Sequence, residues 1–371
     1  MAAPTEDATG PVAATRSRAR QVVQSLLSLA LVVAIFVFVL PQVADLSLVW
    51  EEIRAMTWVE TATLVAVATW NLATYSFVWM ACLPGLGFVK AGVAAEASTA
   101  VANTVPGGSY LAIGLTYTML HSWGFRRSIV TLALLVTGLW NTFAKLALPV
   151  LALVALGFVG GATIGRVIAG ALGVAALIGA VTLITVALRN EASAARIGIL
   201  AGRAASVPLR AVKRPAATGW DIAVVRFREK VIGLVRTRWH LMTGATIVSH
   251  LSLFAVLLVA LRAVGVSEDE VSWAEALAAF SFTRLVTAIP VTPGGLGVVE
   301  LALAGGLVAA GGDNEQVVAA VLVYRVLTFL PPVPIGVACY VVWRVKRSWR
   351  RDPTPSAPSS PAAGGPARIP V

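Results

Sequence analysis

Few residues of this 371-residue chain place a charge within its long apolar stretches, and these residues are the first candidates for chemistry. A charged side chain at the centre of a bilayer costs roughly 3 kcal/mol or more, so each one predicts a functional site or an internal ion pair. The candidates are Glu96, Lys145, Arg284, Glu300 and Arg325. His250 also lies in an apolar stretch, but no acid or second histidine is near it in sequence, so we expect a core histidine.

The arginines are the residues best suited to hold an anion. A guanidinium can bind a phosphate through two parallel hydrogen bonds, which makes Arg284 and Arg325 candidate phosphate ligands. Glu300 would then supply the counter-charge or carry a proton. The competing interpretation is that Arg284, Glu300 and Arg325 only pair with one another and brace a helix bundle. Lys145 is expected to extend toward the membrane surface or to pair with Glu96.

Two Pro-Gly-Gly triplets interrupt apolar stretches, at Pro106-Gly107-Gly108 and at Pro293-Gly294-Gly295. Proline removes a backbone donor and paired glycines favour loops, so a break at membrane depth needs protein or a watery cavity to satisfy the freed groups. The helices that follow would direct free N–H groups and positive dipole ends toward that cavity, where an anion could bind. The alternative is a structural kink without a ligand.

The composition identifies the elements that must position these residues. The chain is 58% hydrophobic and 13% charged, whereas soluble domains carry about a quarter of charged residues. Apolar runs of about 20 residues, the length of a membrane-crossing helix, recur along the sequence. We therefore predict an all-α polytopic membrane protein. Cys82 and Cys339 lie in apolar runs and have no metal-ligand spacing, so no metal and no cofactor is predicted.

The apolar runs predict six full spans and two broken segments. The broken segments are 91–121 and 273–310, interpreted as re-entrant helices that enter and leave on one face. If each instead crosses fully, the number of spans is eight. The six full spans are 22–40, 59–83, 129–156, 164–188, 241–264 and 317–343. They make one transmembrane domain, 22–343, between disordered tails at 1–21 and 344–371.

The charges between the apolar runs predict the orientation. The loop 189–240 carries eleven basic residues against three acidic ones, and the tails are also basic. With six spans, every basic loop falls on one side and every acidic loop on the other, as the positive-inside rule requires. This predicts a protein of the cytoplasmic membrane with both termini in the cytoplasm. Binding of nucleic acid is not expected, because no recognisable module accompanies the basic loop.

The chain also contains a candidate internal repeat. Each of the blocks 58–156 and 241–343 holds a span, a broken segment and a further span, and their Pro-Gly-Gly triplets align. In the predicted topology the first block starts outside and the second inside. Such inverted repeats build a binding site near the midplane of many secondary transporters.

The stretch from Arg284 to Glu300, RLVTAIPVTPGGLGVVE, resembles the membrane domain of lysylphosphatidylglycerol synthases and its stand-alone, flippase-like relatives. This resemblance implies movement of lipids between leaflets. It also implies a substrate site, whose residues would be Arg284, Pro293, Gly294, Gly295, Gly297, Glu300 and Arg325. The first break reads PGGSYLA and lacks the acid that follows the second. We still include Pro106, Gly107, Gly108 and Glu96 as candidates of the first half.

The function expected from these observations is that of a lipid transporter, not an enzyme, which moves an anionic phospholipid or a lipid-linked precursor between leaflets. Its partners are membrane lipids, such as an anionic phospholipid or a polyprenyl-phosphate lipid. One alternative is an integral-membrane transferase that acts on a lipid-linked sugar, for which the acidic run Glu268-Asp269-Glu270 is a weak candidate site. The other is an accessory subunit of a lipid-synthesis complex, and oligomerisation is left open.

Overall fold

The computed structural model describes residues 46–104, 108–158, 220–287 and 292–349, and a few isolated positions between 168 and 182. In these ranges all regular elements are helices, as the apolar runs predict. The predicted spans 22–40 and 164–188 lie outside the described residues, apart from those isolated positions. So do Pro106, Gly107, the tail 1–21 and the end of the chain from Arg350.

Four stretches of the described residues are long and apolar enough to cross a membrane: Trp58–Cys82, Arg127–Phe158, Arg228–Ala263 and Asn314–Val345. They coincide with four predicted spans. The longer helices are α4 (Trp58–Cys82), α5 (Phe88–Thr104), α6 (Gly108–Ser122), α7 (Arg127–Phe158), α10 (Trp220–Ala263), α11 (Trp273–Val286), α12 (Val298–Val308), α13 (Asn314–Phe329) and α14 (Pro332–Val345). The short elements are α3 (Leu46–Ala55), η2 (Pro293–Gly295) and η3 (Arg347–Trp349).

Helix starts are fixed by side chains that satisfy free backbone N–H groups. Thr57 caps α4 and Ser272 caps α11, each in a reciprocal pair with a glutamate three residues later, Glu60 and Glu275 respectively. Asp313 caps α13 by accepting hydrogen bonds from two backbone N–H groups, at 3.1 and 3.2 Å. All three caps lie in the loops predicted to be acidic.

Two predicted boundaries differ from the structure. The last predicted span is two helices, because Pro331 and Pro332 follow α13 directly and the chain bends before α14. The basic loop 189–240 is not a loop throughout, because α10 begins at Trp220 and continues into the predicted span. Helix α10 is therefore 44 residues long, and its first half carries the basic residues.

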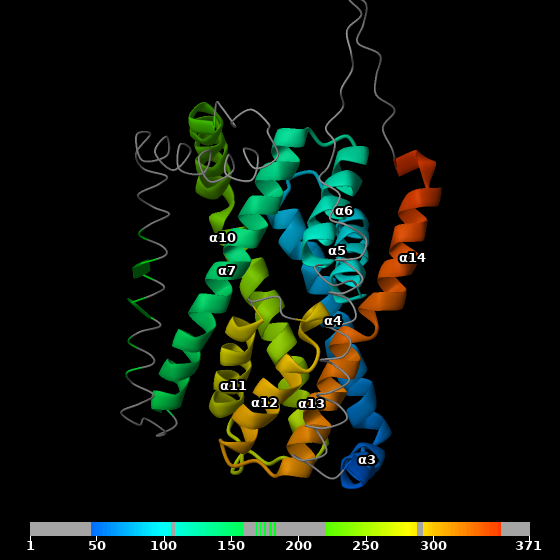
Figure 1. Ribbon diagram of the computed structural model, residues 1–371, viewed down its shortest axis with the longest axis vertical. Coiled ribbons are helices and arrows are strands. Elements are labelled where there is room, and N and C mark those ends of the chain that lie inside the picture. The colour runs from blue at the N-terminus through cyan, green and yellow to red at the C-terminus, as the bar shows by residue number, and fades with distance from the viewer. Residues whose placement is uncertain are drawn as a thin grey trace, which may run out of the picture.

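Each broken segment is a helical hairpin. Helices α5 and α6 pack against each other on either side of the first break, and α11 and α12 do so around the second. Figure 1 shows the two hairpins in opposite halves of the molecule, the first in the upper half and the second in the lower half. At the second break, η2 packs against α5 of the first hairpin.

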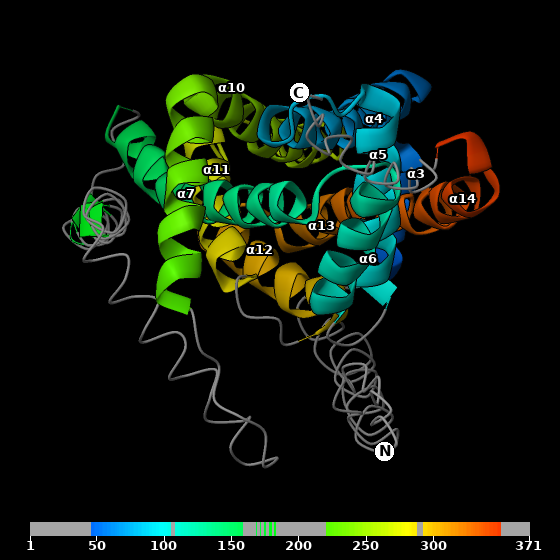
Figure 2. The ribbon, with the colours of Figure 1, turned by 90° about the horizontal axis from the view of Figure 1, so that it is seen from above.

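The two predicted repeats pack on each other reciprocally. Their first helices, α4 and α10, lie along each other, and the hydrogen bond from Asn71 Nδ2 to Ser252 Oγ (2.8 Å) joins them in the core. The last helix of each repeat packs on the hairpin of the other, α7 on α11 and α14 on α5. The view from above agrees: α7 lies beside α11, and α14 beside α5 (Figure 2). A twofold relation between two copies of one motif produces this arrangement.

Each half has its own apolar core. In the half with the second hairpin, buried side chains of α10, α11, α12 and α13 form the larger cluster, with Phe280 and Leu257 at its centre. In the other half, α5 and α6 pack with the start of α7 and with Trp343 of α14. The polar groups between the two cores are therefore the exception in an otherwise apolar interior.

Candidate functional site

The second break is a tight turn that only glycines can form. Gly294 has φ +58° and Gly295 has φ +71°, and Gly297, which precedes α12, has φ +80°. These values are in the left-handed region, where residues with a Cβ are strained. A Cβ on Gly294 would also collide with the Phe329 ring and come within 3.1 Å of Asn103 Oδ1. The turn therefore lies directly against the end of α5.

An arginine holds this turn in place. Arg325 Nε donates to Glu300 Oε1 at 2.8 Å, and Arg325 Nη2 donates to the Gly294 carbonyl at 3.1 Å. Its guanidinium also lies 4.9 Å from the centre of the Phe329 ring. Glu300 is in the first turn of α12 and is only 3% exposed. Arg325 and Glu300 thus form the buried ion pair that the bracing interpretation predicts, and they fix the break to α13.

Arg284 has a different role. It lies in the last turn of α11, and its Nε is buried without a hydrogen-bond partner. No described acid forms an ion pair with Arg284. Within the described part of the chain, the ion pair in the interior joins Glu300 and Arg325 alone. The three-residue brace suggested by the sequence is therefore a pair, and Arg284 is left facing a cavity.

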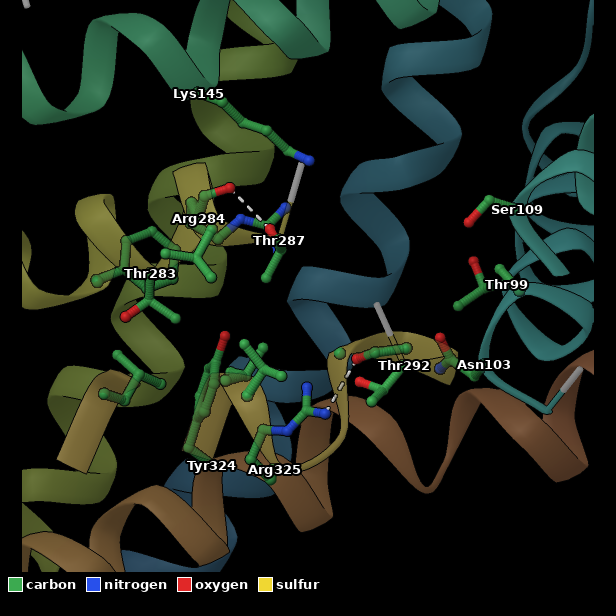
Figure 3. Close-up of a pocket in the computed structure, with 18 of the residues that line it drawn as sticks. Thr99, Asn103, Ser109, Lys145, Thr283, Arg284, Thr287, Thr292, Tyr324 and Arg325 are labelled. Carbon is green, nitrogen blue, oxygen red and sulfur yellow. Dashed lines mark hydrogen bonds between the residues drawn. The ribbon is translucent and has the colours of Figure 1, made fainter. Parts of the chain in front are cut away.

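A cavity of about 400 Å³ lies between the two hairpins (Figure 3). Three cationic side chains line it: Lys145 from α7, Arg284 from α11 and Arg325 from α13. Among the described residues no carboxylate lines it, since Glu300 lies behind Arg325. We call this space the central cavity. Its remaining polar walls are hydroxyls and amides, namely Thr99, Asn103, Ser109, Asn141, Thr283, Thr287, Thr292 and Tyr324.

Residues at the second break and just after the first break line the central cavity. Gly294 and Gly295 line it from the second break, and Val298 and Val299 of the first turn of α12 continue the wall. Ser109, in the first turn of α6, lines it from the first break. Gly108 does not reach the cavity but is packed tightly, because a Cβ there would collide with the carbonyl of Val101. Residues from the first turns of α6 and α12 thus line one cavity, with Ser109 in place of Gly108.

Glu96 and Lys145 are not placed as the sequence suggested. Glu96 is 6% exposed, both of its carboxylate oxygens lack a hydrogen-bond partner, and it does not line the central cavity. Its backbone carbonyl instead packs closely against Gly336 of α14, because a Cβ on Gly336 would collide with that carbonyl oxygen. Lys145 does not pair with it; in Figure 3 its side chain extends toward Arg284.

The sequence did not identify the neutral polar wall of the central cavity. Asn103 and Asn141, for example, are single amides in apolar helices. Asn103 could have been found, because it stands three residues before the first Pro-Gly-Gly triplet. Asn141 could not have been found from the sequence. It stands four residues before Lys145, and this spacing is informative only when α7 is known to pack against the second hairpin.

These features define a class of protein: a helical integral membrane protein with two opposed hairpins around a cationic cavity. Comparison with protein families gives the particular family. Residues 25–336 match the family described as the lysylphosphatidylglycerol synthase TM region, and the chain belongs to it. This membership connects the chain with membrane-lipid handling. No match was found among curated protein sequences.

Proposed function

We propose that this protein moves an anionic phospholipid or lipid-linked precursor between the leaflets of the cytoplasmic membrane, as a transporter and not as an enzyme. The observation that carries the proposal is the central cavity, where Lys145, Arg284 and Arg325 converge with no carboxylate on the wall. Glu300 neutralises Arg325, so Lys145 and Arg284 are the charges that attract an anion, and they do so strongly because water screening there is weak. A phosphate is the anion that lipid headgroups share.

The size of the cavity supports a headgroup as the ligand. Its volume of about 400 Å³ is in the range of small-molecule sites, roughly 300–1,000 Å³. A phosphate with a small substituent fits such a space, while the acyl or polyprenyl chains would remain in the bilayer between helices. The hydroxyls of Thr287 and Thr292 already donate to backbone carbonyls, so in this proposal Lys145 and Arg284 supply the charged donors to the phosphate.

In this proposal both hairpins are re-entrant and enter the membrane from opposite faces. Their breaks then meet at its midplane, where unpaired backbone groups are tolerated because they line a polar cavity. Both termini lie in the cytoplasm, as the basic loop 189–240 favours. Alternating exposure of the central cavity to the two faces would carry the headgroup across.

The test is reconstitution into liposomes that contain a fluorescent phosphatidylglycerol, with a leaflet-accessibility assay. The wild-type protein should move the lipid faster than empty vesicles do. Arg284→Ala and Lys145→Ala should each lower the rate at least about tenfold, because each removes a charge-assisted hydrogen bond to the phosphate.

Arg127→Ala is the matched control. Arg127 is exposed at the start of α7, the helix that carries Lys145, and it does not line the central cavity. It should keep the wild-type rate. Wild-type protein that is folded but no faster than empty vesicles would refute transport. Conversion of the lipid to a new species in the same vesicles would favour the transferase instead.

A further inference from the structure

A second cavity adjoins the central cavity. It has a volume of about 220 Å³, and its walls come from α4, α7, α10 and α11. The two cavities share two wall residues, Asn141 and Arg284. We call the second cavity the histidine chamber, after His250. Neither the family nor the residues singled out in the sequence assign a role to it.

The histidine chamber contains polar atoms that the protein does not satisfy. Thr246 Oγ1 and His250 Nε2 are buried and have no hydrogen-bond partner, and the two residues are 3% and 6% exposed. Such orphaned atoms are uncommon, because a buried unpaired group costs about 1–3 kcal/mol. Other helix hydroxyls here avoid this cost; Thr283 Oγ1, for instance, donates to the Ala279 carbonyl at 2.8 Å. A group that occupies the histidine chamber would therefore have to satisfy these two atoms.

The hydrogen bond of His250 Nδ1 shows whether the other ring nitrogen, Nε2, donates or accepts in the histidine chamber. His250 Nδ1 lies 3.0 Å from the Thr246 carbonyl, which can only accept, so Nδ1 carries the hydrogen. In the neutral ring Nε2 is then an acceptor. Across the chamber Arg284 Nε is an unpartnered donor, and the Thr246 hydroxyl can do either. A ligand must therefore both donate and accept.

Hydroxyl groups meet this requirement, and an ammonium group does not. An ammonium has no lone pair for Arg284 Nε, and it would be repelled by Arg284 and Lys145. No carboxylate lines either cavity to offset that repulsion. A second anion would be held by Arg284 but would face the lone pair of His250 Nε2. A neutral, hydroxyl-bearing group is the chemistry that fits.

We propose that the histidine chamber binds the hydroxyl-bearing part of the headgroup, a polyol or sugar, while its phosphate occupies the central cavity. This inference rests on the proposed function and narrows the substrate to phosphate lipids whose headgroup is neutral and hydroxylated. Arg284 connects the two subsites: its terminal nitrogens hold the phosphate and its Nε donates to a hydroxyl.

Binding of three soluble probes to the purified full-length protein in detergent tests this proposal. Propyl phosphate carries only the phosphate, glycerol 1-phosphate adds hydroxyls on the same carbon chain, and 3-aminopropyl phosphate adds an ammonium. Glycerol 1-phosphate should bind about tenfold more tightly than propyl phosphate, as expected for one or two added hydrogen bonds. The aminopropyl probe should bind more weakly than propyl phosphate.

Thr246→Val should reduce the preference for glycerol 1-phosphate while propyl phosphate binds as before. This variant keeps the side-chain shape and removes a hydroxyl without a partner, so it should fold. His250→Leu should act in the same direction. Thr237→Val is the control: this hydroxyl is exposed on the same helix and donates to the Gly233 carbonyl, and its loss should leave the preference intact.

The outcomes separate the two proposals. Equal binding of propyl phosphate and glycerol 1-phosphate by the wild-type protein would overturn the hydroxyl subsite and leave the phosphate site standing. The same holds if Thr246→Val weakens both probes alike. Failure of all three probes to bind would refute the anion site of the proposed function and the subsite with it.

Discussion

At the scale of single residues, the three partly buried cations of the site differ in how they are neutralised. Arg325 has Glu300 at 2.8 Å and the Gly294 carbonyl at 3.1 Å, so its charge is compensated within the protein. Arg284 and Lys145 line the same cavity without an acid on its wall. Arg325 therefore serves mainly to position the break, and the uncompensated charge that attracts an anion belongs to the other two.

A double-mutant cycle tests the positioning pair. Glu300→Gln and Arg325→Gln should each destabilise the protein by about 3–5 kcal/mol, because each leaves a buried charge without its partner. The double variant should lose no more than either single variant, since it removes both charges. Thermal or denaturant unfolding in detergent measures the effect, and fully additive losses would show that the pair is not coupled.

At the scale of elements, the second break depends on one glycine more than on the proline before it. Gly294 combines a left-handed backbone with a side-chain position that is filled by Phe329. The turn places η2 against α5, so Gly294 lies where the two hairpins touch. We therefore expect a change at Gly294 to disturb the contact between the hairpins.

Gly294→Ala should destabilise the protein by at least about 1–3 kcal/mol from backbone strain, with the clash against Phe329 adding to it. It should also weaken anion binding in the central cavity. Gly114→Ala is the matched control in α6, where a Cβ would meet nothing within 4 Å. That variant should be neutral or stabilise the helix by up to about 1 kcal/mol. Equal effects of the two changes in unfolding experiments would contradict this role of the break.

The sequence predicted the chain breaks and charged residues of the site better than it predicted which side chains meet there. Both Pro-Gly-Gly breaks and the residues Arg284, Glu300 and Arg325 were identifiable, because charge and chain breaks are conspicuous in apolar helices. Lys145 was identified but was expected to extend toward the membrane surface or to pair with Glu96, since nothing local shows that α7 packs against the second hairpin. The pairing of distant helices is set by packing between the repeats, which spacing along one helix does not encode.

At the scale of the whole molecule, the two hairpins and the distribution of charge support one topology. The hairpins occupy opposite halves (Figure 1), and the start of α7 and the α10–α11 loop lie at opposite ends. The first of these ends carries Arg126 and Arg127, and the second carries Glu268, Asp269 and Glu270. The proposed topology places the first end in the cytoplasm, in agreement with the positive-inside rule and with a net charge of +11 concentrated in basic segments.

Cysteine accessibility tests this orientation. In a background without Cys82 and Cys339, Arg126→Cys should react with a membrane-impermeant thiol reagent only from the cytoplasmic side. Asp269→Cys should react only from the outside. Both positions are exposed, so the protein itself does not shield them. Reaction of both from one face would contradict the proposed topology and the opposed hairpins with it.

The central claim is that a cationic cavity between the hairpins carries an anionic headgroup across the membrane. The most direct measurement compares translocation of phosphatidylglycerol and phosphatidylcholine by the same reconstituted protein. We expect the wild-type protein to move the anionic lipid much faster than the zwitterionic one. Lys145→Gln with Arg284→Gln should remove that difference. Equal rates for the two lipids in the wild type, or an unchanged preference in the double variant, would contradict the account.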